Sequence, residues 1–361
     1  MTKTVKVLCI LLSSVFVFSG LFACSNKFGK KEENGVQYTE TENSGDVGWD
    51  VKNVKTKIPD TAVNIFRDAK FKKGINVLGT SPAGEGRTIK GYLDYFGTAS
   101  VVGMDYSRLR PWELTQWYSK QNITDRDTST DYYDETTGEY VYRNDYKMVK
   151  FNPEKGSATL DVNCSAEYGT TAKTIGDWAH LLLEQNIERH YFRDVKSISA
   201  YIDYKIDKMD NMHLDGSYDK NKHAAQFVWY LSLASLKGGV IWFGIMVYDN
   251  RMDAKRGEAP GFNFRGGYSF DKGTNMVMYH IDPYNVYGRE GVTTGKNYKL
   301  AIPLDKDLKF CIEQATKDGV FGVGTTLNDC YFSYTNLGWE LPGTFDVSLT
   351  INRIGLYADL K

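Results

Sequence analysis

Two apolar runs on either side of Lys237-Gly238-Gly239 form the most hydrophobic part of the mature chain. They extend from Gln226 to Leu236 and from Val240 to Tyr248, and both are rich in aromatic and β-branched residues. A Gly-Gly pair between strand-length runs favours the positive φ angles of a tight hairpin. Neither run alternates with polar residues, which is typical of strands buried on both faces. The pattern predicts a hairpin at the centre of a sheet; the alternative is a helical pair, although the second run is short for a buried helix.

Apolar–polar alternation marks further strands. In residues 198–206 and 345–352 every second residue is apolar, which predicts strands with one face in the core and one face in water. Residues 158–162 form a shorter strand candidate. The alternation slips at Arg353, because Ile354 and Leu356 are both apolar, and such a slip predicts a β-bulge.

One segment near the C-terminus has helical spacing instead. The apolar residues at i, i+3, i+4 and i+7 are Leu308, Cys311, Ile312 and Ala315. Asp305 or Asp307 could cap this helix, and Gly319 could end it. Many strands with one short helix predict a mainly β fold. We expect an antiparallel β-sandwich of jelly-roll type, formed as a single domain by residues 58–361.

The N-terminal residues predict an exported protein. Lys3 and Lys6 precede an apolar run that ends in Leu21-Phe22-Ala23-Cys24, as in a secretory signal. This ending resembles the lipobox of bacterial lipoproteins, which implies cleavage after residue 23 and acylation of Cys24. The alternative is an ordinary cleavable signal with an incidental cysteine. The expected location is the bacterial cell envelope, with a lipid anchor at the outer membrane, the cell surface or the periplasmic face.

Residues 24–57 are polar and charged, which predicts a flexible tether between the anchor and the domain. Three cysteines remain in the domain, at Cys164, Cys311 and Cys330. Their odd number leaves open one disulfide with a free thiol, or three buried thiols. No pair has the spacing of metal ligands, so we expect no metal site.

Charge and motifs argue against several classes of partner. The net charge is −1 and the basic residues are spread along the chain, so a nucleic-acid partner is not expected. The stretch from Gly79 to Thr88 lacks the Gly-Lys-[Ser/Thr] end of a phosphate loop, and we expect a turn there instead of a nucleotide site. Patterns of esterases and metalloproteases are also missing from the sequence. We therefore expect no cofactor.

Four segments together carry a resemblance. They are Trp178-Ala-His-Leu-Leu-Leu-Glu-Gln185, His223-Ala-Ala-Gln-Phe227, Trp242-Phe-Gly-Ile245 with Tyr248-Asp-Asn-Arg251, and Gly338-Trp-Glu-Leu-Pro-Gly-Thr-Phe-Asp346. In this order they resemble an uncharacterised group of exported proteins from gut and polysaccharide-degrading bacteria. The resemblance covers roughly Arg108 to the C-terminus. It implies glycan-rich surroundings and no particular reaction.

Four side chains are candidates for catalysis. His180 and Glu184 share a face on a strand and meet at i, i+4 on a helix, so either structure predicts an acid/base pair beside Trp178. The alternative is a buried His–Glu contact. Asp249 ends a buried strand, where it could face a site or could fasten the loop by pairing with Arg251.

Glu340 follows Trp339 just before the turn signal Pro342-Gly343, so it could project from a rim or cap the turn. Glycoside hydrolysis needs two carboxyl groups, which Glu184, Asp249 and Glu340 could supply.

Aromatic residues suggest a sugar-binding surface. The chain has 7 tryptophans and 25 tyrosines, and flat aromatic faces pack well on the apolar faces of sugars. The candidate binding residues are Arg110, Trp112, Trp117, Trp178, Arg251 and Trp339. We expect a membrane-anchored lipoprotein that binds a polysaccharide or oligosaccharide, with cleavage by hydrolase or lyase chemistry left open. The alternative is a structural or adhesive surface protein that contacts protein partners and has no catalytic role.

Overall fold

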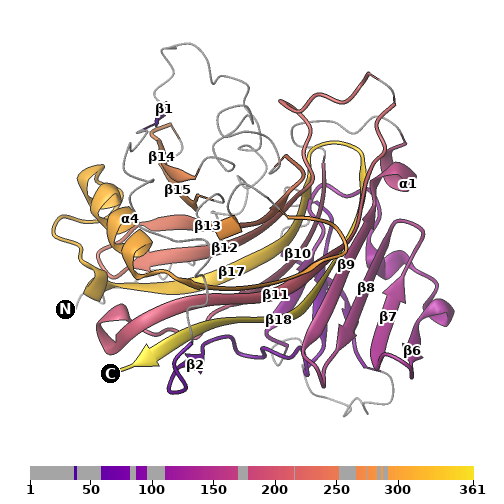
Figure 1. The fold of residues 1–361 in the computed structure, drawn as a ribbon, viewed down its shortest axis with the longest axis horizontal. Coiled ribbons are helices and arrows are strands. Elements are labelled where there is room, and N and C mark those ends of the chain that lie inside the picture. The colour runs from indigo at the N-terminus through magenta and orange to yellow at the C-terminus, as the bar shows by residue number, and fades with distance from the viewer. Residues whose placement is uncertain are drawn as a thin grey trace, which may run out of the picture.

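The computed structural model describes most of the chain after residue 57 (Figure 1). The described residues are 36–38 (backbone only), 58–81, 87–95, 110–169, 178–214, 216–251, 266–273, 275–282, 286–287 and 292–361. The predicted signal peptide, Cys24 and most of the predicted tether lie outside these ranges. Within them, no helix combines the length and apolarity that a membrane crossing requires.

Two sheets pack face to face, which confirms the expected β-sandwich of jelly-roll type (Figure 1). The strands of the ten-stranded sheet, in spatial order, are β1 (Val36–Tyr38), β14 (Gly267–Asp271), β15 (Met276–Ile281), β13 (Val240–Asp249), β12 (Gln226–Ser235), β17 (Cys330–Leu341), β10 (Ala179–Asn186), β5 (Trp112–Thr115), β3 (Ile75–Leu78) and β4 (Ile89–Leu93). The strands of the eight-stranded sheet are β16 (Asn297–Pro303), β11 (Val195–Asn211), β18 (Phe345–Leu360), β9 (Ser157–Asn163), β8 (Lys147–Asn152), β7 (Glu139–Arg143) and β6 (Tyr132–Asp134), with β2 (Val63–Asn64) beside β18. Neighbouring strands are antiparallel except in the pairs β13–β15 and β3–β5.

The predicted central hairpin is confirmed. Strands β12 and β13 pair antiparallel, and β12 lies between β13 and β17 in the middle of the larger sheet. Gly238 and Gly239 have φ angles of 89° and 88°, as the turn requires. A Cβ at Gly239 would lie 2.2 Å from the carbonyl oxygen of Val320, so only glycine fits at this position.

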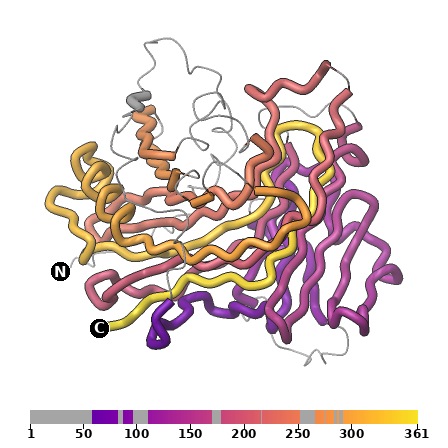
Figure 2. Tube along the Cα trace, in the orientation of Figure 1, coloured from indigo at the N-terminus to yellow at the C-terminus, as the bar shows by residue number. Residues whose placement is uncertain are grey.

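The predicted alternating strands and the bulge are confirmed, but the face expected in water is partly buried, since Ser199, Asp203, Asp346 and Ser348 are each 9% exposed or less. Strands β11 and β18 run side by side along most of the smaller sheet (Figure 2). Their register breaks where Asp203 pairs with Arg353 but Tyr204 pairs with Ile351, which is the position of the predicted slip. The bulge keeps Ile354 and the following apolar residues in the core.

Helix α4 (Asp305–Lys317) closes one end of the sandwich, remote from β6 to β8 (Figure 1). Its predicted apolar face is buried in the core between the sheets. The predicted N-terminal caps are wrong, because Leu304 occupies the N-cap position and its side chain makes no capping hydrogen bond, whereas the predicted stop at Gly319 is confirmed by its φ of 75° just after the C-cap Asp318. Asp307 instead accepts a hydrogen bond from the hydroxyl of Tyr279 on β15, which ties the helix to the larger sheet.

The structure also contains elements that the sequence did not predict. A short helix, α1 (Cys164–Tyr168), follows β9, and 3-10 turns occur at η5 (Ile123–Asp125), η6 (Thr128–Thr130), η7 (Phe192–Asp194) and η9 (Leu327–Asp329). The domain cysteines Cys164, Cys311 and Cys330 are free and buried. Of the two predicted arrangements, the structure therefore has three buried thiols.

Candidate functional site

The outer face of the ten-stranded sheet carries the candidate site. On its central strands, alternate residues point into the core between the sheets, and the residues between them point to the opposite side. We call that opposite side the outer face. Strand register aligns its polar residues in two rows across neighbouring strands.

The first row, here the Glu340 row, consists of His180 on β10, Glu340 on β17, Gln226 on β12 and Asp249 on β13. His180 and Gln226 each lie directly opposite Glu340, and Asp249 lies directly opposite Gln226. The residues next to them along the strands point into the core, among them Trp339. The fold therefore brings together His180, Glu340 and Asp249, which the sequence analysis had selected separately.

His180 is a buried neutral imidazole. Its Nε2 accepts a hydrogen bond of 2.8 Å from the indole nitrogen of Trp178, and its Nδ1 lies 3.1 Å from the carbonyl oxygens of Trp117 and Trp178. Since Nε2 accepts, the proton of the neutral ring belongs on Nδ1, where both carbonyls can receive it. Burial lowers the pKa of His180 to about 4.

The predicted acid/base pair of His180 and Glu184 is wrong. Both residues lie on the same strand, and four residues of extended chain separate their Cα atoms by about 13 Å. Sequence spacing places two such residues on one face of a strand, but it does not bring them into contact. Each side chain has partners of its own instead.

Glu340 is the carboxyl group with the most perturbed surroundings in this row. Its side chain is partly buried, and it has no hydrogen-bond partner among the residues that the structure describes. Burial raises its pKa to about 7. A carboxyl group with this pKa is about half protonated near pH 7, so it can give and recover a proton, as a general acid does.

Asp249 is fully engaged by its neighbours. Oδ1 accepts from the backbone nitrogen and Nε of Arg251 at 2.9 and 2.8 Å, and Oδ2 accepts from Nη2 of Arg251 and Nε2 of Gln226 at 2.6 and 2.7 Å. Four donors fill the acceptor positions of a carboxylate. Asp249 and Arg251 therefore fasten the end of β13, which is the structural alternative that the sequence allowed.

The second row, here the Glu184 row, consists of Glu113 on β5, Glu184 on β10, Asn336 on β17 and Tyr230 on β12. Arg87, between β3 and β4, binds both carboxylates of this row: Nη1 lies 2.8 Å from Oε2 of Glu184, and Nη2 contacts Oε2 of Glu113.

The hydroxyl of Tyr334 donates to the same Oε2 of Glu184 and lies 3.0 Å from Nη1 of Arg87. The guanidinium of Arg87 thus occupies the space between Glu113 and Glu184.

Two buried polar atoms on the outer face have no partner. Oδ1 of Asn336 and Oγ1 of Thr115 form no hydrogen bond with any residue in the described ranges. Asn336 belongs to the Glu184 row, and Thr115 lies opposite Leu182, which in turn pairs with Gly338. A buried polar atom without a partner costs stability unless a ligand or solvent satisfies it. Thr115 is 0% and Asn336 is 7% exposed, so solvent, or a ligand that moves neighbouring side chains, would supply the missing hydrogen bonds.

Aromatic side chains lie at the β13 side of the Glu184 row. Trp242 is partly exposed and packs edge-on against Tyr230 and Tyr334, with ring centroids 6.0 and 6.3 Å away. The hydroxyl of Tyr230 lies 3.0 Å from Nε2 of His280 on β15, whose pKa burial lowers to about 3. The imidazole covers Gly244, where a Cβ would lie 2.5 Å from the ring.

The predicted tryptophan platforms are wrong. Trp112, Trp117, Trp178 and Trp339 are each 3% exposed or less, so none offers a free ring face. Trp112 and Trp339 point into the core, where their indole nitrogens donate to backbone carbonyls at 2.7 and 3.0 Å. Arg110, also buried, forms an ion pair with Asp94.

Several residues of the outer face were not predicted from the sequence. They are Arg87, Glu113, Thr115, Tyr230, Trp242, His280, Tyr334 and Asn336. The alternation of Trp112-Glu113-Leu114-Thr115 contained the signal for two of them, because it places Glu113 and Thr115 opposite the core residues. Strand register, which aligns the others, is not readable from the sequence.

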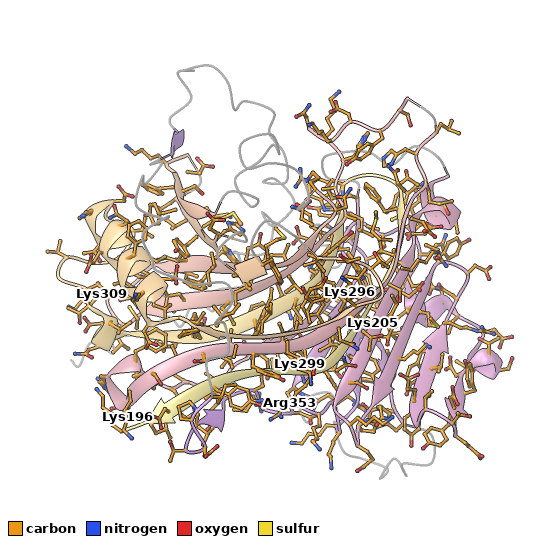
Figure 3. The ribbon with its side chains drawn as sticks, in the orientation of Figure 1. Lys196, Lys205, Lys296, Lys299, Lys309 and Arg353 are labelled. Atoms are coloured by element: carbon orange, nitrogen blue, oxygen red, sulfur yellow. The ribbon has the colours of Figure 1, made fainter. Side chains whose placement is uncertain are left out.

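Basic side chains on the eight-stranded sheet have acidic neighbours. Lys205, Lys299 and Arg353 lie near one another on β11, β16 and β18 (Figure 3). Lys299 and Lys205 form ion pairs of 3.2 and 2.8 Å with Asp203 and Asp207. The part of the chain with assigned structure contains no group of three His, Cys, Asp or Glu side chains that could hold a metal ion.

Neither a protein-family model nor a curated protein matches the chain. Among solved structures, a native family 12 xyloglucanase from Bacillus licheniformis matches with a TM-score of 0.35 and 11% identity, over 64% of this chain and 98% of that chain. The xyloglucanase domain of NopAA, a type three effector from Sinorhizobium fredii in complex with cellobiose, matches with a TM-score of 0.32 and 10% identity. The match covers 63% of this chain and 95% of that chain. Endoglucanase 3 from Trichoderma harzianum matches with a TM-score of 0.29 and 10% identity, over 65% of this chain and 87% of that chain. Similarity at this identity concerns the fold alone, and at these TM-scores we draw nothing about the site from it.

Proposed function

We propose that this protein binds a polysaccharide on the outer face of its ten-stranded sheet while an acylated Cys24 anchors it to a membrane. The observation that carries the binding proposal is the pair of unsatisfied buried atoms, Asn336 Oδ1 and Thr115 Oγ1. Sugar hydroxyl groups are donors as well as acceptors, so they can satisfy both atoms. A polysaccharide supplies such groups at regular intervals along an extended chain.

The surroundings of these two atoms also suit a carbohydrate. Glu113 and Arg87 are partly exposed at one side of the Glu184 row, and they can exchange hydrogen bonds with hydroxyl groups. The partly exposed Trp242 lies on the other side of the row, where its ring can pack on an apolar sugar face. The lipid anchor is supported by the apolar N-terminal run and the residues before Cys24.

A binding screen tests the proposal. The chain from Ser25 onward is titrated with carboxymethyl cellulose, mixed-linkage β-glucan, arabinoxylan, alginate and mucin glycans. Thr115→Val and Asn336→Leu each remove one unsatisfied polar atom and nearly preserve the side-chain volume. Because neither atom has a partner in the free protein, these variants should keep or gain stability. Each should nevertheless weaken glycan binding about five- to tenfold, the loss expected for one hydrogen bond.

Thr136→Val is the matched control, because Thr136 lies in the exposed turn between β6 and β7. It should leave binding unchanged. Unaltered binding in both outer-face variants would place the glycan elsewhere on the protein. If no polysaccharide bound, the binding proposal would fail, and the structural or adhesive role that the sequence also allowed would replace it.

A further inference from the structure

Among the residues that the structure describes, no second carboxyl group lies directly opposite Glu340 on a neighbouring strand. Cleavage of a glycosidic bond with retention needs carboxyl groups about 5–5.5 Å apart, and cleavage with inversion needs them about 6.5–9.5 Å apart. Directly opposite residues on antiparallel strands have Cβ atoms about 4.5–5.5 Å apart. The two residues at that distance from Glu340 are His180 and Gln226. One is a neutral imidazole with both nitrogens engaged, and the other is an amide.

Two further carboxylates of the rows, Asp249 and Glu184, cannot serve instead. Asp249 is two strands from Glu340, about 10 Å at the normal strand spacing, and the donors from Arg251 and Gln226 occupy both of its oxygens. It has no free acceptor position with which to orient a water molecule. Glu184 lies opposite Asn336, which is four residues and about 13 Å from Glu340 along β17.

The pair formed by Glu113 and Glu184 has a suitable spacing but no room between its members. The guanidinium of Arg87 lies between the two carboxylates and binds both. A glycosidic oxygen could enter only by displacing it, which would leave the buried Glu184 without its cation. Such an uncompensated buried charge is strongly unfavourable.

From these positions we infer that Gln226 occupies the place of the second carboxyl group that Glu340 would need, so that the Glu340 row holds a glycan without hydrolysing it. This inference rests on the proposed glycan binding. Gln226 is as long as glutamate, points to the same face as Glu340, and differs from a nucleophile only by its amide nitrogen. That nitrogen is used to donate to Asp249.

Exchanging the amide of Gln226 and the carboxylate of Asp249 should create a site that hydrolyses a glycosidic bond. In the double variant Gln226→Glu/Asp249→Asn, the new amide at 249 can donate to the new carboxylate at 226, so this hydrogen bond is kept with its direction reversed, while the contact of Arg251 Nη2 with Oδ2 is lost. The carboxylate at 226 would attack the anomeric carbon and form an ester while the glycosidic C–O bond breaks, and Glu340 would give its proton to the departing oxygen. Water, deprotonated by Glu340, would then attack the same carbon and free the carboxylate, so the product would retain its anomeric configuration.

The experiment compares binding and release of reducing ends for wild type and variants on the five polysaccharides named above. Wild type should bind one of them and release no reducing ends above the blank. The double variant should still bind it and release reducing ends at least tenfold faster than wild type, with retention by proton NMR. Adding Glu340→Gln to the double variant should abolish that gain, because an amide cannot donate and recover the proton.

Two results would overturn the inference: hydrolysis by wild type, or a folded double variant that binds glycan and remains inactive. If the double variant did not fold, Gln226→Ala in sodium formate would provide the test, since formate supplies an external carboxylate at the vacated position. Formate-dependent cleavage would support the inference, and its absence in a folded, glycan-binding Gln226→Ala protein would refute it. Failure of wild type to bind any glycan is a separate outcome, which refutes the proposed function itself.

Discussion

The indole nitrogen of Trp178 lies 2.8 Å from Nε2 of His180 and donates its hydrogen to it. This contact fixes the tautomer of a histidine that the sequence suggested as an acid or base. With a pKa lowered to about 4 by burial, His180 stays neutral in the folded protein near neutral pH. Its role is to join β10 to the backbone at Trp117.

The same burial predicts a pH dependence of stability. Between pH 6.5 and pH 4 the unfolded chain binds a proton at His180 that the native protein does not bind, so stability falls as the pH falls. His180→Gln removes this component, which is about 3 kcal/mol over that interval. Urea denaturation at pH 7 and pH 4 should therefore show a smaller loss in the variant. Equal losses would mean that His180 does not titrate as the structure indicates.

Glu340 should have the opposite dependence. Its pKa is raised to about 7, so the native protein retains a proton that the unfolded chain releases between pH 4.5 and pH 7. The stability contribution is fully present below pH 4.5 and is lost as the pH rises to 7. Glu340→Gln should be more stable than wild type by about 2 kcal/mol at pH 8 and equally stable at pH 4.5, with allowance for partial exposure. A constant difference at both pH values would contradict the shift.

Trp339 should be a stability residue and not a binding platform. It is fully buried, packs edge-on against Phe227 and Tyr248, and donates to the carbonyl oxygen of Leu160. Trp339→Ala should cost about 3–5 kcal/mol of unfolding free energy. Leu236→Ala, at an exposed position of the central hairpin, should change it by less than about 0.5 kcal/mol. Equal effects in chemical denaturation would rule out the core assignment.

Arg87 should be more important for stability than an ordinary surface arginine. Its removal leaves the carboxylate of Glu184, which is 1% exposed, without a cation. We expect Arg87→Met to cost about 3 kcal/mol and Arg87→Met/Glu184→Gln to recover most of that loss, because the second change removes the buried charge. Thermal unfolding of the single and double variants measures this. No recovery in the double variant would mean that Arg87 acts through packing alone.

Anchoring gives a prediction at the other end of the chain. Cys24→Ala should move the protein from the detergent phase to the aqueous phase, because several acyl chains are needed for stable membrane attachment. Metabolic labelling with a palmitate analogue should be lost in the same variant. Unchanged partitioning and labelling would disprove the lipobox interpretation.

The fold was predictable because its signals are local. Nearby residues carry these signals: the period-two alternation in β11 and β18, the Gly-Gly turn and the helical spacing around Leu308. Alternation and helical spacing show which side chains become buried when the chain folds. The cap of α4 was not predictable, because a contact with Tyr279 from a distant strand uses the carboxylate of Asp307.

The site was predictable only in part. His180, Glu340 and Asp249 were selected one by one, yet their alignment depends on the register of four strands that are distant in sequence. The tryptophans were assigned to binding because composition does not tell a buried ring from an exposed one. In Trp339-Glu340, alternation sends one side chain to the core and its neighbour to the outer face, so only the second could belong to the site.

Gly338 lies between the two rows, opposite Leu182 on one side and Val228 on the other. Its φ is 155°, and a Cβ there would lie 2.1 Å from the carbonyl oxygen of Leu181. No other amino acid fits at this point without moving β10. A substitution at Gly338 therefore cannot add a side chain between the two rows while the strands keep their present spacing. Variation of the chemistry of this face has to come from the residues around Gly338.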